Sequence, residues 1–120
     1  MAVKKVLIFC GTDQPEGAFP PFMLGTGALA CDMKVDMFFT MSGLNIVRKG
    51  GAEKIELEGA PKTLPEFVQA ARELGATFIA CSAAFPIAGV SEDDLIEGVE
   101  CGGVATFIEL AQEADVVLTF

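Results

Sequence analysis

Short apolar runs recur along the chain, and each is bounded by glycine, proline or charged residues. The first run, residues 3–9, contains Val, Leu, Ile and Phe almost without interruption. Such a run predicts a strand buried on both faces, as in a parallel sheet that is covered by helices. Similar runs predict strands at residues 34–40, 76–81 and 116–120, and residues 55–57 are a weaker candidate for a fifth.

Segments with helical signals separate these strands. The apolar segment 18–31 contains Pro20 and Pro21 near its beginning, where proline suits a helix start. Because this segment has almost no polar side, it predicts a helix that is buried all round. Thr63 and Glu66 form a capping-box pattern at the start of another helix. Further helices are predicted at residues 42–48, 91–98 and 102–111.

The alternation of strands and helices indicates right-handed crossovers between parallel strands. We therefore expect a three-layer α/β/α fold with a mainly parallel sheet in flavodoxin-like strand order. A chain of 120 residues has room for one domain, which we expect to span residues 1–120.

The charge of the chain excludes several classes of function. The formal net charge is −9 and there is no histidine. An acidic chain repels phosphate backbones, so we expect no nucleic-acid partner. Without histidine, Ser-His-Asp and Cys-His catalysis and His-containing zinc or haem sites are excluded, and we expect neither a metal nor a cofactor. All basic residues lie at or before Arg72, so the last third is either a solvated acidic face or a docking face for a basic partner.

Targeting signals are not evident. The apolar run after Lys5, residues 6–10, is shorter than the core of a secretory signal. The most apolar stretch, residues 18–30, is too short to span a membrane and is interrupted by proline and glycine. We therefore predict a cytoplasmic protein without a membrane span, in which the four cysteines are free thiols.

Two cysteines lie at predicted strand ends, where ligands of open parallel sheets bind. Cys10 follows the first strand and Cys81 the third, and in a flavodoxin-like order these strands are neighbours. Both thiols would then open onto one end of the sheet, with Gly11, Ser82 and Ala83 in the turns that contact a substrate. Backbone N–H groups in such turns stabilise a thiolate, which is the nucleophilic form of cysteine.

Each cysteine can also be interpreted as a small buried hydrophobic residue. We expect that role for Cys31 and Cys101, whereas both interpretations stay open for Cys10 and Cys81. The segment 25–30 matches the G-x-G-x-x-G/A dinucleotide pattern, but it lies inside a predicted helix rather than between a strand and a helix. Close helix packing through small residues is therefore the better interpretation.

Several stretches resemble the DsrE/DsrF-like family of sulfur-relay proteins, in particular its peroxiredoxin-like branch. They contain Pro-Pro followed by an apolar helix, Phe-Phe-Thr before Gly-Leu-Asn-Ile-Val-Arg-Lys, Ala-Cys-Ser before a glycine, and Glu-Gly-Val-Glu before Gly-Gly-Val-Ala-Thr. These stretches are residues 20–30, 37–49, 78–89 and 95–106. The resemblance implies a three-layer α/β/α subunit that assembles into trimers or hexamers, and a cysteine, here Cys81, that carries sulfur as a persulfide.

The leading hypothesis is therefore a sulfur carrier or sulfurtransferase that exchanges sulfane sulfur with donor and acceptor proteins through Cys81. Two other classes stay open. The strand-end cleft could bind a small ligand or a nucleotide, or the protein could be an inert structural subunit with an apolar assembly face at residues 18–30. The mean hydropathy of +0.50 is high for a monomer, so we expect a homo-oligomer in each case.

Overall fold

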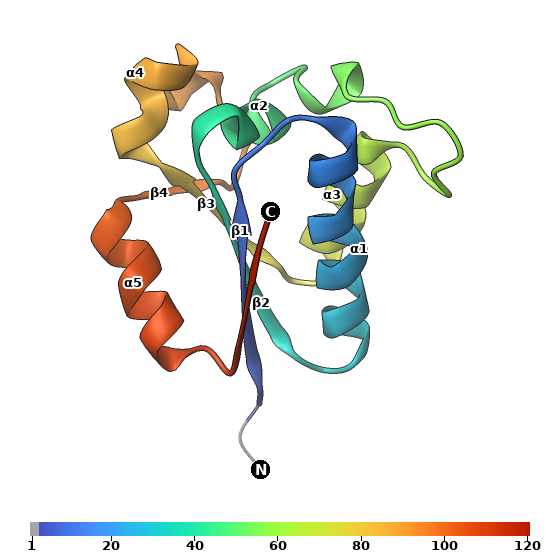
Figure 1. Ribbon diagram of the computed structural model, residues 1–120, viewed down its shortest axis with the longest axis vertical. Helices are drawn as coiled ribbons and strands as arrows, with labels where there is room; N and C mark the ends of the chain where they lie inside the picture. The colour runs from blue at the N-terminus through green and yellow to red at the C-terminus, as the bar shows by residue number, and fades with distance from the viewer. Residues whose placement is uncertain (1–2) are drawn as a thin grey trace.

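The computed structural model describes residues 3–120 and contains a five-stranded sheet in which all strand pairs are parallel (Figure 1). The predicted α/β class with a parallel sheet is thus confirmed. The weaker candidate at residues 55–57 does not form a strand, and the fifth strand lies at Glu100–Gly102. The strands are β1 (Lys5–Cys10), β2 (Lys34–Phe39), β3 (Thr77–Cys81), β4 (Glu100–Gly102) and β5 (Val116–Thr119).

The strand order is β4-β3-β2-β1-β5, so the expected flavodoxin-like order is wrong. In this order β2 lies between β1 and β3: Cys10 pairs with Phe39, and Phe39 pairs with Ala80. The chain steps in one direction from β1 to β4 and only then returns to the far side of β1 with β5. Local hydrophobic patterns do not encode such non-local choices, which explains the error.

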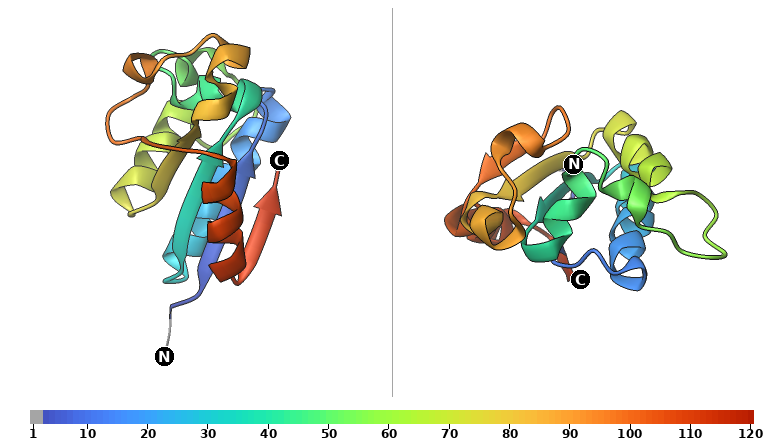
Figure 2. Two further views of the ribbon diagram at one scale, coloured as in Figure 1. Left: turned by 90° about the vertical axis from the view of Figure 1, so that its left-hand side faces the viewer. Right: turned by 90° about the horizontal axis from the view of Figure 1, so that it is seen from above.

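Helices cover the two faces of the sheet unequally. In Figures 1 and 2, α1 and α3 lie on one face and α5 on the other, whereas the short α2 and α4 lie at the carboxyl ends of the strands. This arrangement follows from right-handed crossovers, because the return from β4 to β5 reverses direction and moves α5 to the opposite face. The helices are α1 (Pro15–Ala30), α2 (Leu44–Val47), α3 (Leu64–Glu73), α4 (Phe85–Ala88) and α5 (Val104–Glu113).

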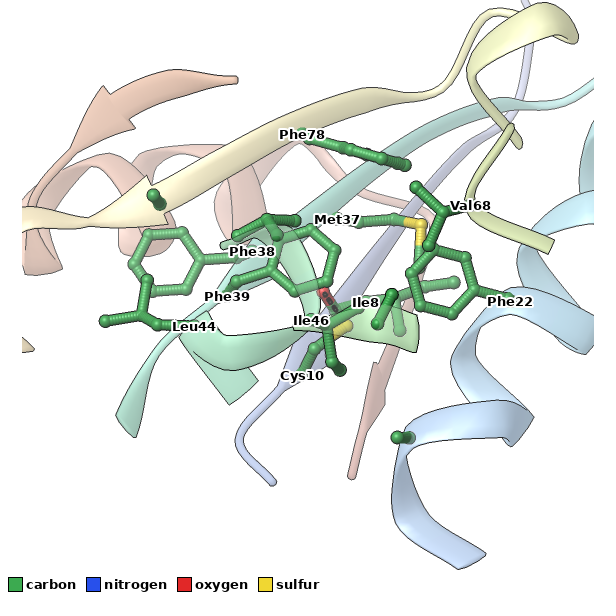
Figure 3. Close-up of a cluster of buried hydrophobic side chains, with 14 of the residues drawn as sticks. Ile8, Cys10, Phe22, Met37, Phe38, Phe39, Leu44, Ile46, Val68 and Phe78 are labelled. Carbon is green, nitrogen blue, oxygen red and sulfur yellow. Dashed lines mark hydrogen bonds between the residues drawn. The ribbon is translucent and has the colours of Figure 1, made fainter. Parts of the chain in front are cut away.

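The main core lies between the sheet and α1 (Figure 3). Phe22 of α1 is fully buried and packs on Phe39 and Phe78, with ring centroids 6.1 and 6.0 Å away. Gly25 is buried, and a Cβ at this position would lie 3.4 Å from the Cδ1 atom of Ile8, so α1 lies close to β1 here. The helix-packing interpretation of segment 25–30 therefore holds at Gly25, whereas Gly27 and Ala30 are exposed.

The helix α3 begins and ends as its sequence predicts. The Thr63 N–H donates to Glu66 Oε1 (2.9 Å), and the Glu66 N–H donates to Thr63 Oγ1 (3.3 Å), which completes the capping box. After the helix, Gly75 adopts a φ of +101°, a conformation that favours glycine. These local signals set where α3 begins and ends.

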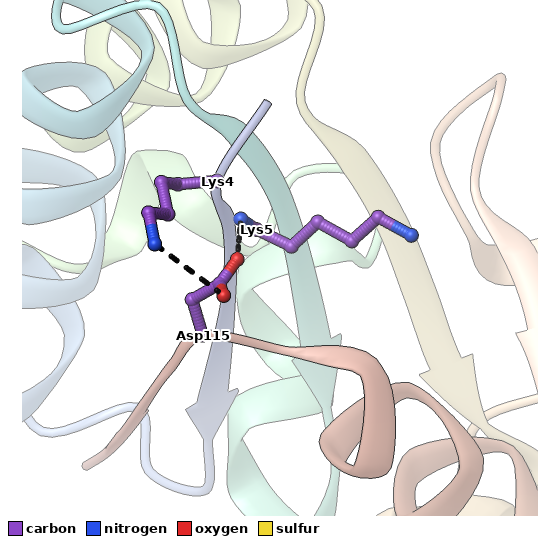
Figure 4. A network of polar contacts seen from close by, with 3 residues as sticks. All are labelled: Lys4, Lys5 and Asp115. Carbon is purple, nitrogen blue, oxygen red and sulfur yellow. Dashed lines mark hydrogen bonds and ion pairs between the residues drawn. The ribbon is translucent and has the colours of Figure 1, made fainter. Parts of the chain in front are cut away.

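Polar contacts attach the start of β5 to β1 (Figure 4). The Lys5 N–H donates to Asp115 Oδ2 (2.8 Å), and Lys4 Nζ lies 3.9 Å from Asp115 Oδ1. The ion pair is exposed and contributes little to stability, so the backbone hydrogen bond is the contact that sets where β5 begins. Among residues 3–120, no helix is both long and apolar enough to cross a bilayer.

Candidate functional site

Cys81 is the last residue of β3, at the carboxyl edge of the sheet. Its exposed fraction is 4%, whereas Ser82 and Ala83 in the following turn are exposed. The Ser82 hydroxyl donates to the Gly102 carbonyl oxygen (3.2 Å), which attaches this turn to β4. The Cys81 thiol is thus buried in this conformation, although the next two residues along the chain are exposed.

The side chain of Cys81 lies on the α5 face of the sheet. Ile79 is in register with Phe38, whose ring packs against Phe107 of α5 at a centroid distance of 5.1 Å. Side chains two residues apart on a strand share a face, so Cys81 follows Ile79 onto this side.

The amino-terminal end of α5 lies beside Cys81. Gly102 of β4 pairs with Cys81, and α5 begins two residues later at Val104. The Gly103 N–H donates to Thr106 Oγ1 (3.0 Å), which closes the first turn. The partial positive charge at the start of α5 therefore lies near the strand end that carries Cys81.

Cys10 has a different environment. It is 1% exposed, its Sγ lies 3.9 Å from the Ile8 carbonyl oxygen, and burial strongly raises the pKa of its thiol (Figure 3). It shares a face with Ile8, which packs on α1, so it lies on the opposite face from Cys81.

The expectation that Cys10 and Cys81 open onto one site is therefore wrong. With β2 between them, their strands are about 10 Å apart, given a strand spacing of about 4.8 Å, which is too far for a disulfide. Gly11 lies with Cys10 rather than with Cys81, and its N–H donates to the Phe120 carbonyl oxygen (2.9 Å). The structure thus brings together Cys81, Ser82 and Ala83, but not Cys10 or Gly11.

The two cysteines expected in the core are exposed instead. Cys31 follows α1 at the opposite edge of the sheet from Cys81. Cys101 lies in the edge strand β4, and its pKa is raised by partial burial and by the nearby carboxylate of Glu92. The prediction that these two cysteines are buried was wrong because it placed Cys31 at the end of an all-buried helix and did not recognise β4 as a strand.

A chain of polar side chains crosses the carboxyl edge, and sequence reasoning missed it. Asn45 Nδ2 donates to Asp13 Oδ2 (3.0 Å), and Arg48 Nη1 donates to Asn45 Oδ1 (3.1 Å). Arg48 Nη2 then donates to the Gly89 carbonyl oxygen (2.6 Å) at the end of α4. The chain links the loop after β1, the helix α2 and the turn after β3, and no local signal reveals it because Asp13 and Gly89 are far apart in sequence.

Two cavities lie among the described residues near this edge. One of about 340 Å³ is lined by the loop after β1, by Asn45 and Arg48, and by Lys54. Another of about 490 Å³ is lined by Phe19 and by residues between 53 and 66. Within residues 3–120, no group of three or more His, Cys, Asp or Glu side chains is placed to hold a metal ion.

The parallel α/β fold and the cysteine at the end of β3 together define a class of small α/β proteins. Comparison with known sequences shows which family this class is. The chain belongs to the DsrE/DsrF-like family, whose profile matches residues 4–120. The resemblance inferred from the sequence is thereby confirmed.

Individual relatives are distant. The chain is similar to the sulfur carrier protein DsrE2 of Allochromatium vinosum, with 24% identity over 98% of this chain and 99% of the relative. It is also similar to the uncharacterized protein MJ0760 of Methanocaldococcus jannaschii, with 28% identity over 88% of this chain, but it spans only 38% of that relative's length. The crystal structure of the ychN protein from E. coli matches with a TM-score of 0.78 and 19% identity, and covers 99% of this chain and 100% of that one, which supports the fold alone.

Proposed function

We propose that this protein is a sulfur carrier that holds sulfane sulfur as a persulfide on Cys81. The observation that carries the proposal is the position of Cys81: it ends β3 on the face where α5 begins, directly before the exposed Ser82 and Ala83. Family membership and the name of the Allochromatium vinosum relative support the same class of function.

The transfer needs only thiol chemistry. The Cys81 thiolate attacks the terminal sulfur of a donor persulfide, the donor's S–S bond breaks, and the donor leaves as a thiolate while Cys81 becomes a persulfide. An acceptor thiolate then attacks the terminal sulfur of Cys81, which returns to a thiolate. No net oxidation or reduction occurs, so neither a cofactor nor a histidine base is required. A donor protein and an acceptor protein are the partners, and a reducing compartment such as the cytoplasm suits the free thiols.

An exposed fraction of 4% means that the turn after Cys81 moves before the thiol reacts. That turn is suited to local opening because α4 contains no buried residue and Ile87 is 69% exposed. In the open form, the backbone N–H groups of Ser82 and Ala83 are the nearest candidates to bind the persulfide anion. Cys10 and Gly11 have no part in this proposal, because one is sealed in the core and the other is already hydrogen-bonded.

Mass spectrometry of the reduced protein after incubation with glutathione persulfide tests the proposal. We expect one added sulfur atom, located on the peptide that contains Cys81, and its loss when an acceptor thiol is added. Cys31→Ser and Cys101→Ser are the matched controls, because these exposed thiols could take up sulfur without specificity. Full uptake by Cys81→Ser would show that another cysteine is the carrier.

We also propose that the protein assembles with copies of itself, as a trimer or a hexamer. Every residue of α5 retains some exposure, and large apolar side chains are exposed on α5 and on the edge strand β5: Val104, Ile108, Val116 and Val117 are 66, 52, 39 and 43% exposed. Exposed apolar surface of this kind on a small subunit is typical of an interface.

The low exposure of Cys81 and this apolar face also favour a second candidate, a structural subunit whose thiols are inert. The two functions differ in one measurement. A structural subunit would form the oligomer but add no sulfur at Cys81 under native conditions, even after prolonged incubation with the donor.

A further inference from the structure

The turn that follows Cys81 comprises residues 82–89, of which only Ala84 is buried. Phe85 and Ala88 pack partly buried against the core, and the Val90 N–H donates to the Phe85 carbonyl oxygen (3.0 Å). The near end of the turn is fixed by β3 and by the Ser82 hydrogen bond to Gly102. Its far end is Gly89, which has a φ of +66° and ends α4. In Figures 1 and 2, α4 lies above the same face of the sheet as α5, which is the face that Cys81 occupies.

Arg48 holds this far end. Its guanidinium donates to the Gly89 carbonyl oxygen at 2.6 Å, and a charged donor makes this bond stronger than a neutral one. Asn45 Oδ1 accepts from the same guanidinium, and Asn45 is held in turn by Asp13. The guanidinium is therefore oriented by Asn45 directly and by Asp13 through Asn45.

The chain beyond the turn is fixed independently of the Arg48 side chain. The Lys49 N–H donates to the Asp94 carbonyl oxygen (2.8 Å), and the Ile96 N–H donates to the Val47 carbonyl oxygen (2.8 Å). Leu95 in this segment is buried. Loss of the Arg48 side chain should therefore release the turn at Gly89 while the segment that follows stays in place.

We propose that Arg48 is a positioning residue that latches the turn at residues 82–89 over Cys81. With the hydrogen bond to Gly89 intact, the turn is closed and the thiol is covered; when the bond breaks, the turn opens and the thiol is reached by donor or acceptor. Asn45 acts through Arg48 by orienting its guanidinium. The role of this latch in sulfur transfer rests on the proposed function, whereas the hydrogen bond between Arg48 and Gly89 does not.

Peptide-resolved alkylation of the native protein measures the latch without any sulfur donor. Arg48→Met keeps the aliphatic stem and removes the donor. We expect the alkylation rate of Cys81 to rise about tenfold, which is near the lower end of the effect of a hydrogen bond from a charged group. Arg72→Met is the matched control, because the Arg72 guanidinium also donates to a backbone carbonyl, that of Glu97, which lies outside the turn. This control should leave the Cys81 rate unchanged.

Cys10, which is sealed in the core, reports global loosening in the same samples. An unchanged Cys81 rate in Arg48→Met, an equal rise in Arg72→Met, or a parallel rise at Cys10 would each overturn the latch. Asn45→Ala gives a second test. It should raise the alkylation rate of Cys81 less than Arg48→Met does, and adding it to Arg48→Met should cause no further rise. Faster alkylation of Cys81 without any sulfur uptake would leave the latch standing and remove the sulfur-carrier proposal instead.

Discussion

Gly43 positions the helix that carries Asn45 and Arg48, and its replacement by alanine should be costly. A Cβ at Gly43 would lie 2.1 Å from the carbonyl oxygen of Cys10 and 2.8 Å from its carbonyl carbon. That oxygen cannot move away freely, because it accepts a hydrogen bond from the Thr40 N–H (3.1 Å). Either α2 or the end of β1 must shift, so the added methyl group displaces the backbone next to Asn45 and Arg48.

The cost combines overpacking with the weakening of one backbone hydrogen bond. Together these amount to about 2–4 kcal/mol, which lowers the melting temperature of a domain of this size by on the order of 10 °C. Gly27→Ala is the matched control: no atom lies within 4 Å of its added Cβ, and the site is an exposed position in α1. Alanine there should stabilise the protein by about 0.5–1 kcal/mol.

Urea unfolding followed by far-UV circular dichroism suits this comparison, because the chain has no Trp or Tyr for fluorescence. Both variants should be measured at one protein concentration, since assembly stabilises the folded state by mass action. A free energy of unfolding for Gly43→Ala within about 0.5 kcal/mol of the parent, the usual range for surface substitutions, would refute the close contact between α2 and β1.

Two further predictions concern the cap of α3 and the assembly face. Backbone and then side-chain hydrogen bonds from Thr63 lower the pKa of Glu66, so the capping box stabilises the fold above the ordinary carboxyl pKa and loses its effect as the pH falls through the lowered one. Thr63→Ala should raise the Glu66 pKa part of the way back, as read by NMR titration, and cost about 1 kcal/mol; an unmoved pKa would contradict the box. Sedimentation should show a trimer or hexamer that Ile108→Asp shifts to smaller species, and a parent protein that sediments only as monomer would contradict the assembly proposal.

The sequence predicts where most strands and helices lie along the chain, but not which of them lie side by side in the fold. The four strands with apolar runs lie where the pattern places them, whereas β4 consists of Glu, Cys and Gly and carries no strand signal. The helix α1 begins at Pro15 rather than near Pro20, because Pro15 occupies the first turn while the later prolines lie inside the helix. The burial of Pro21 and Phe22 there shows that packing on the sheet outweighs the missing backbone donors.

The candidate site likewise has features that the sequence predicts and features that only the tertiary structure shows. A strand end places Cys81 at the carboxyl edge, so its position follows from the local pattern and the rule for parallel sheets. The relation of Cys81 to Cys10 depends on strand order, and the contact of Arg48 with Gly89 joins residues 41 positions apart. Both are tertiary facts, and no local propensity or periodicity contains them.

The pairing of β5 with β1 has a consequence for biosynthesis. Val6 is in register with Val116, so one side of the first strand has no partner until the ribosome has added about 110 more residues. At about 5–20 residues per second, that edge waits for several seconds or more. During this interval the nascent chain exposes an apolar strand edge that can pair with another polypeptide, and because β2 pairs with the other side of β1, chaperone binding would be the main protection of this edge.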